Sequence, residues 1–202
     1  MSSRLGLLQP SSLNAEQKSL HDELTQSIRS RWDDSPSSPQ FFLDDGTLIG
    51  PYGALLHHAE VARQFQAMVR ALHTIPGLSL YGREITIAVA GSRSHAAYEL
   101  YAHHIIATQR AGITEAELHE IHAGKCPSTL TEEGKAVFEL ATALGQPGVL
   151  DQVIYDRAVH VLGRDGAAAT IHYAGFYSYI GTILNGFDVR VPEAAGAPTA
   201  NS

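Results

Sequence analysis

The spacing of the apolar residues limits the possible folds of this chain more than any other feature. Apolar side chains recur three and four positions apart in one segment after another, and no alternating run is long enough for a convincing strand. In residues 14–32, Leu20, Leu24 and Ile28 follow this spacing, and Asn14 with Gln17 forms a capping-box signal. The pattern predicts an all-α fold in which helices pack on helices.

The same spacing, together with capping and breaking residues, predicts the remaining helices. Residues 79–91 carry β-branched side chains that leave helix or strand open locally, and we interpret the segment as a helix because its neighbours are helical. Residues 33–51 are interpreted as an ordered loop anchored by Phe41, Phe42 and Leu43, and residues 193–202 as a disordered tail after a single domain, 1–192. The predicted helices are 50–74, 79–91, 94–112 with Ser94 as the cap, 114–124, 131–144, 150–162 and 166–184.

Composition excludes several classes of protein. The 202 residues include 14 Lys and Arg against 21 Asp and Glu, a formal charge of -7, and the basic residues do not cluster, so a nucleic-acid partner is not expected. No apolar run reaches the length of a membrane span, and the N-terminus lacks the apolar core of a secretory signal. The single cysteine, Cys126, has no internal disulfide partner. A cytoplasmic protein without a membrane partner is expected.

One predicted helix carries residues suited to acid–base chemistry. His95, Glu99 and His103 stand four residues apart and are expected to share a face. A carboxylate one turn from an imidazole can fix its tautomer and favour its protonated form, as a general acid requires. The alternative is an exposed ion pair that contributes little. Glu84, on the preceding segment, can join the same face if the two helices pack side by side.

The histidines are further candidates for a binding site. His57, which with His58 lies one turn into the predicted helix after Pro51, is the better candidate to hold an anionic substrate group at a positive helix end. The 11 histidines suggest a metal, but no H-E-x-x-H motif or Cys/His cluster is present, so neither a metal nor a cofactor is predicted.

The motifs GPYGALLHH, REITIAVA and YELYAHHIIATQRAGIT, with the late stretch AGFYSYIGTILNGFDV, resemble the carboxymuconolactone decarboxylase family over residues 45–192. The resemblance implies an all-helical fold of the alkylhydroperoxidase D (AhpD) type, assembled as a homo-oligomer, commonly a trimer or hexamer. In the peroxidase branch of the family, a glutamate precedes a Cys-x-x-Cys-x-x-x-His motif. Glu84 would match this glutamate and His103 the histidine, while Ala96 and Glu99 stand at the two cysteine positions. Thiol peroxidase chemistry needs those thiols, so it is not expected.

The resemblance points instead to a cofactor-free decarboxylase of a small unsaturated lactone acid or a related aromatic or polyketide-like acid. His103, Glu99 and Glu84 are the predicted catalytic residues, with His103 as the proton donor. His57, Tyr98, His95 and Tyr52 are the predicted substrate-binding residues. The alternatives are an isomerase, lactone hydrolase or cyclase that uses the same pocket, and a non-catalytic oligomer that binds a small molecule.

Overall fold

The structure, a computed structural model, describes residues 4–33, 35 and 37–192, and these residues form eight α-helices and one short 3-10 helix. An isolated bridge pairs Phe42 with Leu48, inside the loop predicted between the first two helices, and no described residue lies in an extended strand. The prediction of an all-α fold is confirmed. The elements are η1 (Pro10–Ser12), α1 (Ala15–Arg29), α2 (Gly50–Leu55), α3 (Ala59–Thr74), α4 (Leu80–Ser94), α5 (Ala97–Gln109), α6 (Glu115–His122), α7 (Glu132–Ala143) and α8 (Gln152–Gly186).

Side-chain caps account for several helix starts. Asn14 and Gln17 form a complete capping box at α1, and Thr114 with Glu117 forms another at α6. Thr131 accepts a hydrogen bond from the backbone N–H of Gly134 at the start of α7. Because these caps satisfy backbone N–H groups that the helix leaves unpaired, the starts can be read from local sequence alone.

Two of the predicted helices are divided differently in the structure. The segment 50–74 is two helices, α2 and α3, because the chain leaves the helical conformation after Leu55 and His58 becomes the N-cap of α3. Ser94 does not cap a helix but is the last residue of α4, and His95 follows it in the left-handed conformation (φ 50°, ψ 36°). The next helix, α5, begins only at Ala97.

The two helices predicted over 150–162 and 166–184 are joined end to end in α8, which is interrupted at Gly163 (φ 71°, ψ 171°). Only glycine adopts this conformation without strain. The second part of α8 passes close to the 76–78 turn at Gly166, where an added Cβ would collide with the Gly77 carbonyl. Small residues therefore let α8 lie close against the rest of the bundle.

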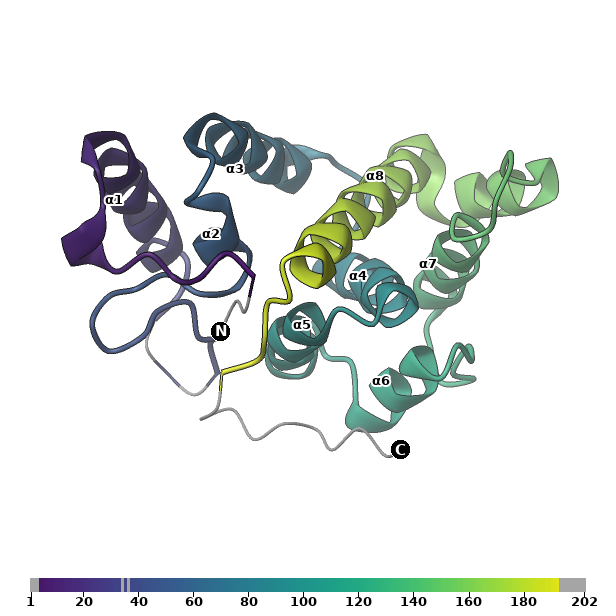
Figure 1. Cartoon of the computed structure of the whole chain (residues 1–202). Helices are drawn as coiled ribbons and strands as arrows, with labels where there is room; N and C mark the ends of the chain where they lie inside the picture. The colour runs from purple at the N-terminus through teal and green to yellow at the C-terminus, as the bar shows by residue number, and fades with distance from the viewer. Residues whose placement is uncertain (1–3, 34, 36, 193–202) are drawn as a thin grey trace.

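Helix α4 lies at the centre of the bundle and packs against α5, α6, α7 and α8, while α1, α2 and α3 lie on the opposite side of α8 from α7 (Figure 1). One cluster of buried apolar residues joins α1–α3 to α5 and the end of α8, and a second joins α4, α6 and α7 to the middle of α8. Phe176 and Tyr177 pack against both clusters. The site described below lies where these two clusters meet.

In the described part of the chain, no helix is long and apolar enough to cross a membrane. The predicted tail, 193–202, lies outside the described residues.

Candidate active site

Three ionisable side chains meet between α4 and α5. His103 Nδ1 lies 2.8 Å from Glu84 Oε2, and His103 Nε2 lies 3.1 Å from Glu99 Oε1. Glu84 comes from α4, in which residues 84–91 are all buried, and Glu99 and His103 stand one turn apart on α5. The two helices approach closely at Gly91, where an added Cβ would lie 3.2 Å from the Leu100 side chain. The structure thus brings together the three residues predicted to be catalytic.

The group is buried, which strengthens every charge interaction within it. Glu84 is 3% exposed and Glu99 4% exposed, and the His103 side chain is 17% exposed. Burial by itself lowers the pKa of His103, but the charges of Glu84 and Glu99, together with the hydrogen bond to Glu84, outweigh it and raise the pKa to about 10. The imidazole is therefore protonated at neutral pH. An exposed, solvated ion pair, the alternative reading of the Glu99–His103 spacing, does not describe this arrangement.

The two nitrogens of His103 are held differently. Nδ1 makes a short hydrogen bond with Glu84 Oε2. Nε2 is close to Glu99 Oε1, but the two are not aligned for a hydrogen bond, and Oε1 is buried without a hydrogen-bond partner among the described residues. Glu84 thus fixes the orientation of the ring, and the proton on Nε2 is the one available for transfer.

An aromatic wall from α8 covers the imidazole. The ring of Tyr177 lies 5.1 Å from that of His103 at 89°, and Tyr173 stacks on Tyr177 with centroids 6.1 Å apart. Burial, together with the charges of Glu99 and Glu84, holds the pKa of Tyr177 well above its usual range, so its hydroxyl stays protonated. Tyr173 and Tyr177 were not among the predicted site residues. The signal that could have found them is their four-residue spacing in the stretch YAGFY, residues 173–177.

The three residues open into a cavity of about 230 Å³ between α2, α3, α4, α5, α8 and the segment after α1, which contributes Arg31, Trp32 and Phe41. This is roughly the volume of eight waters in the liquid, so the cavity suits a small molecule. Three arginines, Arg31, Arg83 and Arg110, also line it. Counted as formal charges with His103 protonated, the three arginines and His103 against the two glutamates give the lining a net charge of +2. The cavity therefore favours an anion.

The arginines are held by neutral groups. The guanidinium of Arg110 lies 4.3 Å over the Trp32 ring, and that of Arg83 lies 5.6 Å over the Tyr173 ring. Arg31 donates hydrogen bonds to the carbonyl and hydroxyl of Ser27. Among the described residues, no carboxylate lies within 4.0 Å of these three guanidiniums. Their positive charge is available to a bound anion.

Two of the four predicted substrate-binding residues line the cavity. Tyr52, at 8% exposure, and Tyr98 both contribute to its wall. The hydroxyl of Tyr98 donates a hydrogen bond of 2.6 Å to the Gln40 carbonyl, so it anchors the 33–49 loop rather than pointing a free polar group at a ligand. Burial raises the pKa of Tyr52, and the charge of Arg31 opposes this.

The other two, His57 and His95, do not line the cavity. The prediction for His57 is wrong in its geometry because α2 ends at Leu55, so this residue is not in the first turn of a helix, and its Nε2 lies 3.2 Å from the Gly6 carbonyl. The prediction that His95 shares a face with Glu99 is wrong because the left-handed turn at His95 ends α4 before α5 begins. His95 is exposed there.

Comparison with known proteins was made on sequence and on structure. No protein-family model matches the sequence, and the search of curated proteins finds no similar one. Two crystal structures of the debrominase Bmp8 are similar in structure. A cysteine-to-alanine variant in complex with 2,3,4-tribromopyrrole has a TM-score of 0.68 at 13% identity, covering 96% of this chain and 96% of that one. The apo form has a TM-score of 0.67 at 13% identity, covering 94% and 92%.

The chain has the AhpD-like fold. An identity of 13% shows the fold alone, and no family model supports the resemblance to carboxymuconolactone decarboxylases. The activity of Bmp8 does not transfer by this likeness. In this chain, Cys126 is exposed and lines a different hollow, beside α7 and the start of α8. Burial raises the pKa of its thiol, which disfavours the reactive thiolate.

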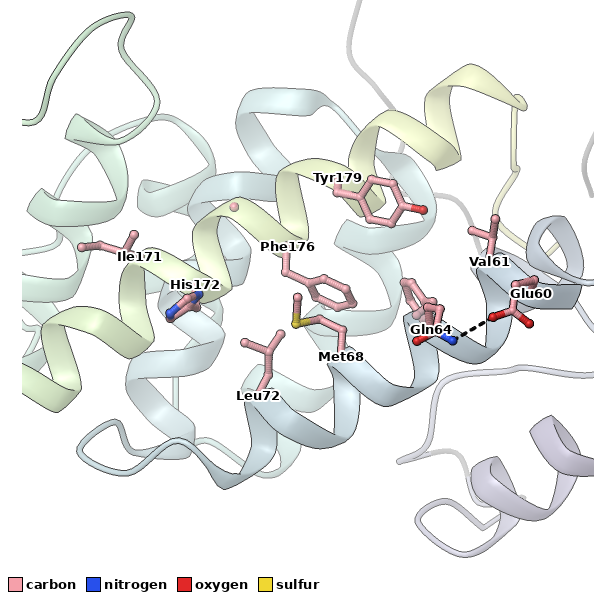
Figure 2. A pocket seen from close by; sticks show the side chains of 11 residues that line it. Glu60, Val61, Gln64, Met68, Leu72, Ile171, His172, Phe176 and Tyr179 are labelled. Atoms are coloured by element: carbon pink, nitrogen blue, oxygen red, sulfur yellow. Dashed lines mark hydrogen bonds between the residues drawn. The ribbon is translucent and has the colours of Figure 1, made fainter. Parts of the chain in front are cut away.

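A larger hollow lies on the outer surface between α3 and α8 (Figure 2). Met68, Leu72 and Phe176 point into it, and its one drawn hydrogen bond joins Gln64 to Glu60. Phe65 and Phe176, 5.1 Å apart, line both this groove and the inner cavity. The groove is mainly apolar and lacks a group of interacting acids and bases, so the inner cavity is the better candidate for chemistry.

No three His, Cys, Asp or Glu side chains of the described residues are arranged to hold a metal ion.

Proposed function

We propose that this protein is a cofactor-independent decarboxylase that acts on a small, unsaturated or aromatic carboxylic acid. The observation that carries the proposal is the buried Glu84–His103–Glu99 group, which presents a protonated imidazole to a small cavity whose lining is net positive. The AhpD-like fold, shared with an enzyme, supports a catalytic role.

Decarboxylation leaves an electron pair on the carbon that loses CO2. A conjugated carbonyl or lactone in the substrate takes up this pair as an enolate, so no cofactor is required. The enzyme has to orient the substrate, stabilise the enolate oxygen and protonate the carbon. General acid catalysis of the last step typically contributes about 10²–10⁴-fold.

His103 is the proposed proton donor, acting through Nε2. Its Nδ1 is occupied by Glu84, which keeps the ring in one orientation and keeps it charged. A pKa of about 10 is high for a general acid, but an enolate carbon is a strong base and accepts a proton from such a donor. Glu99 lies beside Nε2 and stabilises the positive charge of the imidazolium. Its carboxylate can also accept a proton and pass it to Nε2 after His103 has protonated the substrate.

Arg83 is the proposed electrostatic partner of the substrate. It directly precedes Glu84 on α4 and lines the cavity. A guanidinium in a buried site stabilises an enolate oxygen more strongly than water does, because it is already oriented before the charge develops. It also offsets the repulsion that a substrate anion would experience near the two carboxylates.

The test is incubation with a panel of unsaturated lactone acids and aromatic β-keto acids, followed by mass spectrometry of the products. Loss of CO2 with uptake of one solvent deuteron in D2O is expected for the substrate. The variant His103→Gln should lose activity by at least about 10²-fold while remaining folded, and His160→Gln, at an exposed position of α8, is the matched control. Deuterium uptake without CO2 release would indicate an isomerase instead. Wild-type rates in His103→Gln would refute the assignment.

A further inference from the structure

Glu99 and His103 also line a second and much smaller hollow, between α4, α5 and α6. Its volume is about 10 Å³, which is close to the space that the centre of a single water molecule needs. The polar side chains around it are those of Glu99, His103, His104 and His122, and the remainder of the wall is apolar. A single water has the size and the hydrogen-bond partners to occupy it.

The buried oxygen of Glu99 points to the same conclusion. Glu99 is 4% exposed, and its Oε1, although 3.1 Å from His103 Nε2, accepts no hydrogen bond from the described residues. A buried carboxylate oxygen without a partner costs free energy, and nearly all such groups in proteins are paired with protein or water. A water in this hollow would donate the missing hydrogen bond.

His122 connects this hollow to solvent. It lies in the last turn of α6, is exposed, and lines the hollow. The titratable groups around it are His119 on its own helix, and His104 and Glu99 on α5, with Glu115 lying 3.0 Å from His104 Nε2. Partial burial, and then the charges of His104 and His119, lower the pKa of His122. A neutral imidazole has one donor and one acceptor nitrogen and can pass a proton from one side to the other.

We propose that His122 and one water in this hollow return a proton from solvent to Glu99 and His103 after each turnover. The proposal rests on the proposed function, because decarboxylation consumes one proton for each CO2 released. The bond between the carboxylate carbon and the substrate breaks, its electron pair stays on the substrate, and a C–H bond forms with the proton of His103 Nε2. A proton then moves from solvent through His122 and the water to Glu99 Oε1 and on to Nε2, which restores the starting charge.

The first experiment needs no substrate. In protein labelled with 15N-histidine, NMR measures how fast the Nε2 proton of His103 exchanges with water. We expect exchange to be slowed at least tenfold in His122→Phe and in His122→Gln. His119→Gln, a neighbour on α6 that does not line the hollow, should exchange at the wild-type rate. Unchanged exchange in both His122 variants, with the fold intact, would overturn the proposal.

The second experiment uses turnover of the substrate found in the panel. In His122→Gln we expect kcat to fall by up to about 10²-fold with KM unchanged, and imidazole added to the buffer to restore it, since a small base can replace the missing shuttle. A merely structural role would not give rescue by imidazole. If the His122 variants slow exchange of the His103 Nε2 proton but the protein decarboxylates no acid of the panel, the proton route through His122 is upheld and the decarboxylase assignment is refuted. Normal kcat without buffer dependence would refute the route alone.

Discussion

Replacing Glu84 by glutamine removes the charge that lies 2.8 Å from His103 Nδ1 and keeps the size of the side chain. In the native protein the pKa of His103 is about 10, against an ordinary value of 6.5. Burial lowers the pKa of His103, and the charges of two carboxylates raise it, with Glu84 making the larger contribution of the two. The glutamine variant should therefore have a His103 whose pKa is lower than in the native protein.

The size of the effect on stability follows from the difference between the ordinary and the raised pKa of His103. At about 1.4 kcal/mol per pH unit, the interval between 6.5 and about 10 corresponds to at most about 5 kcal/mol of unfolding free energy. Because the pKa is raised on folding, this contribution is fully present below pH 6.5 and is lost as the pH rises through about 10. If Glu84 supplies about half, Glu84→Gln should cost about 2–3 kcal/mol at pH 6 and far less at pH 10.

The assay is urea unfolding at pH 6, 8 and 10, with NMR titration of His103 in both proteins. Glu115→Gln is the control, because Glu115 contacts His104 in a similar ion pair but is 72% exposed, so its removal should cost under about 1 kcal/mol. An equal loss of stability at pH 6 and pH 10 would mean that Glu84 acts through packing, and a native His103 that titrates near 6.5 would refute the electrostatic reasoning.

Three further changes test other parts of the description. Arg83→Ala should raise KM and lower kcat for a carboxylate substrate, whereas stability in urea should change little; unchanged kinetics would remove Arg83 from the site. Cys126→Ser should leave turnover unchanged in steady-state assays, because the thiol is exposed and outside the cavity, and any large loss would point to thiol chemistry. The expected homo-oligomer needs an apolar contact surface, and Val61 and Met68 are about half exposed beside the α3–α8 groove. Met68→Glu should then lower the molar mass measured by light scattering, and an unchanged oligomer would exclude this surface.

Local sequence determined the helices whose starts are capped and the pairing of Glu99 with His103. A capping box such as Asn14 with Gln17, or the four-residue spacing on α5, involves neighbours within one turn of the chain, so it can be read without knowing the rest of the fold. The all-helical architecture was also accessible, because apolar residues recur at helical spacing in most segments of the chain.

Tertiary packing decided how the site is completed. Glu84 reaches His103 across 19 residues because α4 lies against α5. Tyr177 comes from α8, Arg83 from α4 and Arg31 from the segment after α1, and no local pattern encodes how these parts of the chain approach one another. The structure also places His95 outside the site, because His95 itself adopts the left-handed conformation that ends α4 before α5 begins. Spacing within a helix fixes only which side chains share a face. Which faces then meet depends on how all the helices bury their apolar surfaces together, and that is settled by the whole chain.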